Sequence, residues 1–295
     1  MGLFFSSDRF TRPGPGVRPD APRKKGVARL AEIMGRDMWN FFRAGFLAFL
    51  GCLPFIIGMF FAVETHALLF MLLAGIIGGL IAGPELSAMA DTVLRSLRDE
   101  PGYWWETYRR VWKRNARESL VPGMLTGLVL SMQIFTLFHM SVISAGIVTW
   151  ALLILSFVVT LGLESYIWPQ IALLDLPLYG ILKNSLLLFL GYLPRSLGAI
   201  AIKAVYWGAI LLFFPLTTII LPFTNFWLPM LPALLCIYQP LNKCFTIEST
   251  INKMREDELN AALAKDNEPL PEDPTEKAEE STEASSDDSS SDDVQ

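Results

Sequence analysis

The chain has 295 residues, of which 52% are hydrophobic and 18% charged, and its mean hydropathy is +0.41. This composition excludes an ordinary soluble domain and indicates a core embedded in lipid. The net charge of −5 hides two opposite parts, because residues 266–295 hold 12 acidic residues and one Lys, whereas residues 1–265 hold 23 basic and 17 acidic residues. The basic part suits an anionic inner leaflet as partner, and no nucleic-acid module is visible.

A polar segment, residues 1–38, opens the chain and is predicted to be cytoplasmic. It is rich in Pro and Gly between Pro13 and Pro22 and basic from Arg23 to Lys25. The apolar stretch that follows begins too late and runs too long for a cleavable signal peptide.

Six apolar runs follow, and they predict an all-α membrane protein with a membrane domain over residues 39–250. The spans are expected at about 39–63, with Pro54 as a kink, and at 67–82, 120–138, 145–166, 197–216 and a last run ending near Phe245. All 24 Lys and Arg residues then lie on one side, and the outer loops near 64–66, 137–144 and 217–227 contain none. By the positive-inside rule, both termini are expected in the cytoplasm of a cell whose plasma (inner) membrane the chain crosses.

The second predicted span carries a row of glycines at Gly75, Gly79 and Gly83. Residues four apart share a helix face, so one face of this span has almost no side chains. Close packing of another helix is one interpretation, and a ligand passage lined by backbone is the other.

The cytoplasmic connection near 85–119 contains a predicted amphipathic helix. Its aromatic arc holds Trp104, Trp105, Tyr108, Val111 and Trp112, and its basic arc holds Arg109, Arg110, Lys113, Arg114 and Arg117. Such a helix can lie at the headgroups, with its basic side on anionic phosphates. It serves either as a topology anchor or as a docking surface for a cytoplasmic partner.

A second inner-face segment is predicted near 170–191, interrupted only by Asp175, Lys183 and Asn184. It either lies in the interface or re-enters the membrane. Residues 251–295 form a cytoplasmic C-terminal segment whose acidic tail, from about residue 266, is expected to be disordered because it contains no aromatic residues.

Five polar residues fall inside predicted spans or at their ends: Arg43, Glu85, Gln133, Glu164 and Lys203. Polar groups in lipid are costly and are therefore functional candidates. Glu85 or Glu164 can form an ion pair with Arg43 or Lys203, or bind a cation. Gln133 is suited to a hydrogen bond between helices or to contact with a sugar hydroxyl.

No metal or cofactor site is predicted. His66, His139 and Glu64 all fall at the outer surface, but they lack metal-ligand spacing, and the three cysteines are expected to serve packing. Nucleophile-elbow, Walker and dinucleotide motifs are absent, so we do not expect an enzyme. Trp150, Trp207 and Trp227 suit either stacking on a sugar or an interfacial aromatic belt.

Several short motifs occur in a characteristic order. They are Phe4-Phe5 with Asp8, Asn40, Cys52-Leu53-Pro54, Gly83-Pro84 with Ala88, Trp112-Lys113-Arg114-Asn115 and Lys183-Asn184-Ser185. Together, over about residues 1–250, they resemble the YesL-like bacterial membrane proteins, also called domain of unknown function 624. The chain departs from that pattern in its longer Pro-rich start and its acidic tail. The resemblance implies a bacterial inner-membrane protein associated with sugar permease components, and it implies no catalytic residues.

Three functions follow from these features. The first is an accessory or regulatory component of carbohydrate uptake. The second is an independent small-solute transporter, in which Glu85, Glu164, Gln133 and Arg43 would converge on one cavity. The third is a membrane scaffold or intramembrane enzyme.

Overall fold

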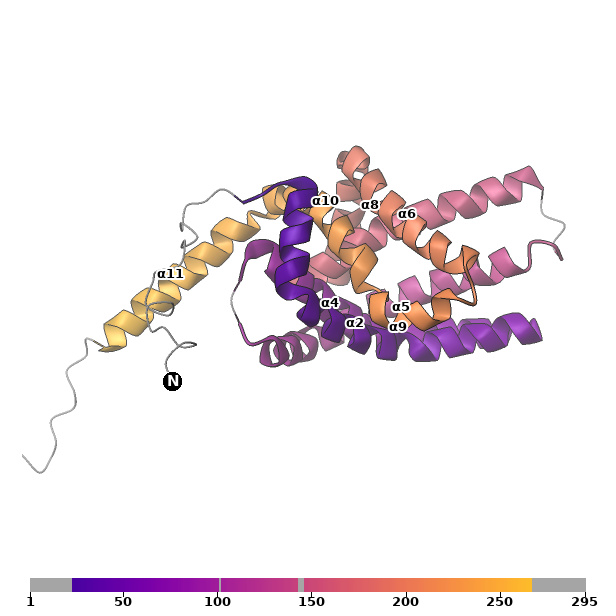
Figure 1. The fold of residues 1–295 in the computed structure, drawn as a ribbon, viewed down its shortest axis with the longest axis horizontal. Coiled ribbons are helices and arrows are strands. Elements are labelled where there is room, and N and C mark those ends of the chain that lie inside the picture. The colour runs from indigo at the N-terminus through magenta and orange to yellow at the C-terminus, as the bar shows by residue number, and fades with distance from the viewer. Residues whose placement is uncertain (1–22, 101, 143–145, 267–295) are drawn as a thin grey trace, which may run out of the picture. The chain divides into compact units, whose positions relative to one another are not determined.

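The computed structural model describes residues 23–100, 102–142 and 146–266, and all regular secondary structure in these ranges is helical (Figure 1). The all-α prediction is therefore confirmed. The chain divides into two units, residues 1–245 and 246–295, which we describe separately. The second unit contributes the single helix α11 (Ile247–Asp266). The predicted Pro-rich start, the Phe4-Phe5 and Asp8 motif and the acidic tail beyond Asp266 lie outside the described residues.

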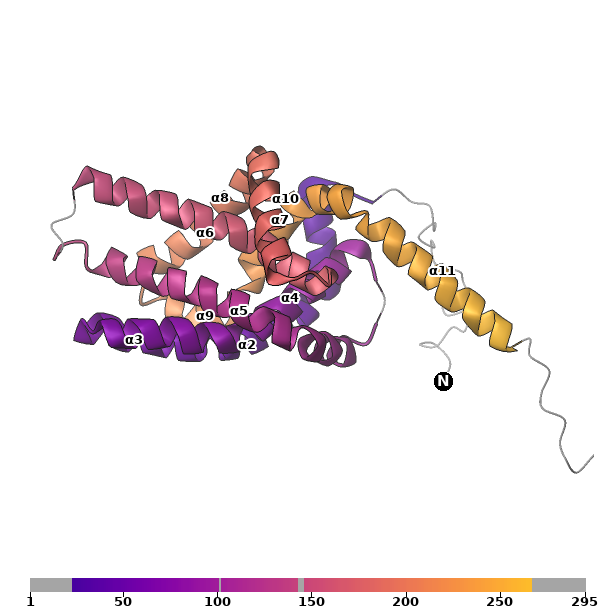
Figure 2. The same cartoon turned by 180° about the vertical axis from the view of Figure 1, so that it is seen from behind.

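The first unit is built from helices joined by short connections. They are α2 (Gly26–Thr65), α3 (Leu68–Leu73), the π-helix η1 (Ala74–Gly78), α4 (Gly79–Arg98), α5 (Trp104–Phe138), α6 (Ile147–Leu173), α7 (Leu178–Gly191), α8 (Leu193–Leu212), α9 (Thr217–Thr224) and α10 (Trp227–Phe245). Figure 2 shows the same helices from behind.

Five helical segments in the described part of the chain are long and apolar enough to cross a membrane. They are Gly26–Thr65, Leu68–Arg98, Trp104–Phe138, Ile147–Leu173 and Leu193–Leu212. The sixth predicted span corresponds to α10, which is not one of the five: its 19 residues include Gln239, Asn242 and Lys243 near its end. The described chain thus has five candidate spans, one fewer than the sequence predicts, which suggests a multi-pass helical membrane protein.

The first helix begins earlier than the predicted span. Residues 26–38, assigned to the polar segment, form the first turns of α2. Ile33, Phe41 and Ala44 are fully buried, as expected for positions that share one helix face. Arg29, also buried, donates a hydrogen bond of 3.1 Å to the Leu97 carbonyl at the end of α4. The part of α2 that precedes the apolar run is therefore packed against α4.

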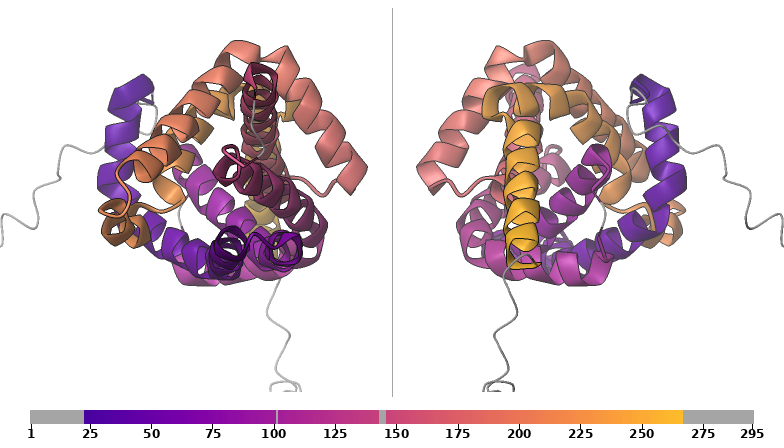
Figure 3. Two further views of the ribbon diagram at one scale, coloured as in Figure 1. Left: turned by 90° about the vertical axis from the view of Figure 1, so that its right-hand side faces the viewer. Right: turned by 90° about the vertical axis from the view of Figure 1, so that its left-hand side faces the viewer.

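The first predicted inner-face segment consists of continuations of the spans, whereas most of the second forms a separate helix. The aromatic and basic stretch at 104–117 is the start of the 35-residue helix α5, and residues 170–173 are the end of α6. The remainder of the second segment forms α7. Figure 3 shows α7 and α8 diverging from their junction on either side of α6.

The connection between α8 and α10 differs from its prediction as an outer loop. The other two outer connections meet at one end of the helices, where His66 and His139 lie 2.6 Å apart. Residues near 223–227 instead pack on the first half of α2, with ring centroids 6.0 Å apart for both Phe42–Phe223 and Phe41–Trp227. The absence of charged residues from this segment concealed the difference, because an uncharged run suits a complete span or a partial one.

Candidate functional site

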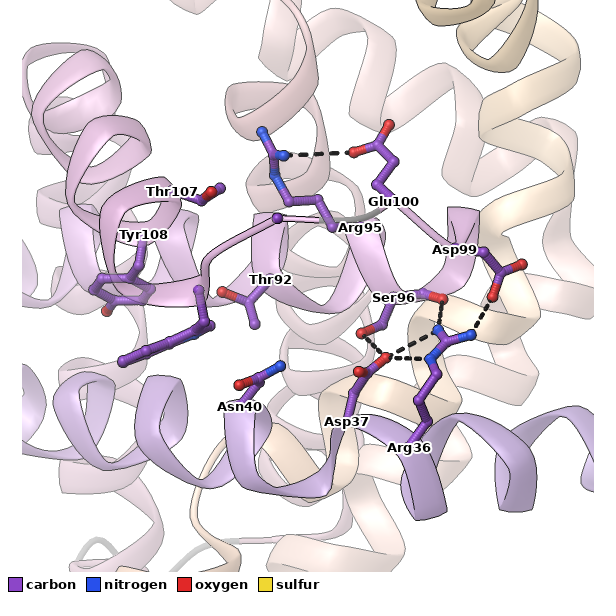
Figure 4. Close-up of a pocket in the computed structure, with 12 residues that line it drawn as sticks. Arg36, Asp37, Asn40, Thr92, Arg95, Ser96, Asp99, Glu100, Thr107 and Tyr108 are labelled. Carbon is purple, nitrogen blue, oxygen red and sulfur yellow. Dashed lines mark hydrogen bonds and ion pairs between the residues drawn. The ribbon is translucent and has the colours of Figure 1, made fainter. Parts of the chain in front are cut away.

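A polar cavity of about 290 Å³ lies where α2, the end of α4 and the start of α5 meet (Figure 4). Its lining consists of Arg36, Asp37, Asn40, Thr92, Arg95, Ser96, Asp99, Glu100, Gly102, Trp104, Thr107 and Tyr108. The volume is close to the lower limit of small-molecule pockets. Because three separate helices contribute, the cavity depends on the tertiary fold.

One wall of the cavity is a network centred on Asp99. Asp99 ends α4 in the left-handed backbone conformation (φ 59°), which Asp tolerates better than most residues. Its carboxylate accepts hydrogen bonds from Arg36 and, at 2.6 Å, from Arg29. Burial tends to raise the pKa of Asp99, but these hydrogen bonds outweigh it and hold the pKa below its ordinary value. Asp99 is therefore a fixed anion that joins α2 to α4.

The other charges in the lining are also paired with each other. Arg36 contacts Asp37 at 2.9 Å, and the Ser96 hydroxyl donates to the same carboxylate at 2.6 Å. Arg95 lies 2.7 Å from Asp91 and 3.7 Å from Glu100. No charged group in the described lining is left without an opposite charge, so the wall offers little net attraction to an ion.

Neutral groups in the lining remain free. Among the described residues, the Asn40 amide and the Thr107 hydroxyl have no hydrogen-bond partner, and the Trp104 indole nitrogen Nε1 is buried without one. Figure 4 shows Asn40 of α2 pointing toward Thr92 of α4. Asn40 and Thr107 are half-buried, so their amide and hydroxyl are open to a ligand that supplies both donors and acceptors.

Glu85 lies behind the cavity wall. Tyr108, which lines the cavity, donates to one Glu85 oxygen at 2.5 Å, and Trp112 Nε1 donates to the other at 2.9 Å. Tyr108 is buried, so this part of the aromatic arc contacts α4, where the sequence predicted headgroups. Both oxygens of Glu85 are thus already occupied by α5.

The rest of the aromatic and basic helix face is accessible. Trp105 and Trp112 are 48% and 36% exposed, and Arg109 and Lys113 are also exposed. This surface is accessible to headgroups or to a partner, and contact with either stays a prediction.

The other intramembrane candidates lie at separate places. Glu164 lies 3.8 Å from Lys203, and Trp168 also donates to Glu164 at 3.2 Å. Gln133 donates to Thr160 at 2.7 Å, which joins α5 to α6. The adjoining cavity at the Glu164–Lys203 pair has a volume of only about 10 Å³.

Arg43 has aromatic partners. Its guanidinium lies 5.1 Å from the centre of the Trp39 ring and 5.6 Å from that of Trp104. Such cation–π contacts stabilise a cation at the edge of the apolar region. The predicted polar residues therefore do not converge on one central cavity.

The glycine row faces α5 at close range. A Cβ atom on Gly79 or Gly83 would meet the backbone carbonyl of Gly123 or Ser119, and one on Gly75 would meet Ser131 and Leu128. The row therefore lies in a tight helix contact, and it does not line the cavity.

Sequence reasoning missed most of the cavity lining. It placed Arg36 and Asp37 in the polar N-terminal segment, residues 1–38, and did not single out Asp99 or Thr107. The available signal was the spacing of Ile33, Asp37, Phe41 and Ala44, which extends the buried helix face beyond the apolar run.

His66 and His139 approach one another, but no third ligand joins them: among the described residues, no three His, Cys, Asp or Glu side chains form a group suited to a metal ion.

No family model, curated protein or solved structure matches the chain.

Proposed function

We propose that this protein is a non-catalytic accessory or regulatory component of carbohydrate uptake in the bacterial plasma membrane, and that its cavity binds a small neutral polyhydroxylated solute. The observation that carries the proposal is the contrast between charged and neutral groups in the cavity lining. The charged groups are paired with each other, whereas the half-buried Asn40 amide and Thr107 hydroxyl have no hydrogen-bond partner among the described residues. Sugar hydroxyls both donate and accept hydrogen bonds, so they match such a set.

The resemblance to the YesL-like proteins supports the same proposal, and we infer membership of that family from the ordered motifs. The charge distribution supports an orientation with both termini, the cavity and the basic face of α5 in or near the cytoplasm. The exposed face around Trp105, Arg109 and Lys113 then suits contact with anionic lipid or a permease component.

Titration calorimetry of the full-length protein in lipid nanodiscs tests the binding step. Neutral monosaccharides and disaccharides should release or absorb heat on binding, whereas phosphorylated sugars and amino acids should not. Binding of the charged compounds alone, or of none of the compounds, would contradict the proposal.

An independent transporter is the second candidate, favoured by the buried Glu164–Lys203 pair. Proteoliposomes that contain only this protein distinguish the two. The accessory function predicts no sugar uptake above that of empty vesicles, and a transporter predicts uptake that is lost on Glu164→Gln.

A further inference from the structure

We infer that α8, α9 and α10 form a re-entrant hairpin whose tip ends among lipid acyl chains, without reaching the far side of the membrane. Both ends of the hairpin lie at its base, where the Tyr192 hydroxyl and Cys244 Sγ are 3.6 Å apart. The chain thus returns to the level from which α8 started.

The depth of the hairpin follows from its contacts with α2. Phe223, near the end of α9, packs on Phe42, and Asn225 and Trp227 occupy the space beside Gly45. Thr65 ends α2 23 residues beyond Phe42, or about 35 Å at the helical rise. Phe223 follows Thr217 by six residues along α9, and this rise accounts for at most about 9 Å of that depth.

The tip therefore stops well short of the end of α2 where His66 meets His139. Figures 1 and 2 both show the α8–α9 turn ending before α2 and α6 do. A complete span followed by an outer loop would have brought residues 217–227 to that same end.

The surface of the tip identifies what covers it. No charged residue occurs between Lys203 and Lys243, and Leu212, Phe214 and Ile219 are 78%, 70% and 74% exposed. Leu216 and Phe223 are likewise mostly exposed. Such a continuous apolar surface is unfavourable in water, and the uncharged stretch around it offers no ionic contact to a partner protein. Acyl chains fit it best.

The inference gives four complete crossings: α2, the α3–η1–α4 segment, α5 and α6. An even number keeps both ends of the first unit on one side, so the charge asymmetry is preserved with fewer spans. It does not depend on sugar binding.

Cysteine accessibility tests the hairpin. In a background of Cys52→Ala, Cys236→Ala and Cys244→Ala, single variants Phe214→Cys and Thr217→Cys are compared with Ser141→Cys and Lys113→Cys in intact and permeabilised cells. A membrane-impermeant maleimide should label the two reference positions from opposite sides of the membrane. It should label the tip positions at least tenfold more slowly than either reference in both preparations.

A second measurement tests what covers the tip. A spin label at Phe214→Cys in liposomes should be relaxed strongly by oxygen, which concentrates in lipid, and weakly by a water-soluble nickel chelate. Labelling of the tip from the Ser141 side at the Ser141 rate would overturn the inference. So would a spin label shielded from both relaxants, which would indicate that protein covers the tip.

Discussion

Tyr108 of α5 and Glu85 of α4 are joined by a hydrogen bond of 2.5 Å between the phenol and the carboxylate. Tyr108→Phe removes the donor and leaves Trp112 as the remaining side-chain donor to Glu85. We expect a loss of about 1 to 3 kcal/mol in the free energy of unfolding, because the half-buried Glu85 carboxylate loses one of its two side-chain donors. Thermal unfolding in detergent measures it. Tyr103→Phe, at a 76% exposed position, should change the melting temperature little; equal effects of both variants would contradict the role of the bond.

Binding in the cavity should depend on its free neutral groups. Asn40→Ala and Thr107→Val are each expected to raise the Kd for a neutral sugar about 2- to 10-fold, which corresponds to the loss of one ordinary hydrogen bond. Calorimetry in nanodiscs measures the change. Thr136→Val serves as the matched control, because its hydroxyl bonds to Met132 of its own helix, away from the cavity. An unchanged Kd in both cavity variants would exclude these groups from binding.

Stability should fall in acid through Asp99. Its pKa in the folded state is below the ordinary value of 3.8, so its contribution is present above that value and is lost as the pH falls through the folded-state pKa. The difference in melting temperature between the natural protein and Asp99→Asn should therefore hold from pH 7 to about 4.5 and shrink below about 3.8. Glu106→Gln, which breaks an exposed pair with Arg110, should show little difference at any pH. A difference for Asp99→Asn that grows in acid would contradict this assignment.

Side chains added to the glycine row, where α4 contacts α5, should lower stability. Gly79→Ala would place a Cβ atom against the Gly123 carbonyl, and we expect a loss of about 1 to 3 kcal/mol from overpacking. Gly198→Ala is the control, because nothing lies within 4 Å of the added Cβ. Comparison of the two melting temperatures checks the prediction, and a stabilised Gly79→Ala variant would refute it.

Loss of one partner of the Glu164–Lys203 pair should lower the free energy of unfolding more than loss of both partners. Lys203→Met leaves a carboxylate without its cation, with an expected cost on the order of 3 kcal/mol. The double variant Glu164→Gln/Lys203→Met should recover part of that loss. Unfolding of the two single variants, Lys203→Met and Glu164→Gln, and of the double variant in the same detergent provides the measurement, and a double loss equal to the sum of the single losses would show that the two side chains do not interact.

The sequence was sufficient to predict helices where apolar runs are long, and it predicted the glycine row because its spacing is local. It could not predict the cavity, because Arg29 and Arg36 meet Asp99 only after α2 and α4 have packed. Pro101 and Gly102 signal that a helix ends before them, but they do not show that the carboxylate of Asp99 faces α2. For Gln133, polarity indicated a need for a partner, but the choice of Thr160 depends on the rotation of two helices. The hairpin was missed because hydropathy reports lipid contact and does not report depth.

The π-helical turn at Ala74–Gly78 marks a place where the second span can absorb a change of one residue in its length. Its residues face two neighbours: Ala74 and Gly78 meet Gly58 and Phe55 of α2, while Gly75 meets Ser131 of α5. A π turn holds one residue more than an α turn. Deletion of one residue within this turn would leave an ordinary α turn and keep Leu68–Leu73 facing the same two neighbours, whereas the same deletion in the regular part of α4 would rotate the preceding residues by about 100° around the helix axis. We therefore expect a one-residue deletion within Ala74–Gly78 to lower stability less than a one-residue deletion within α4.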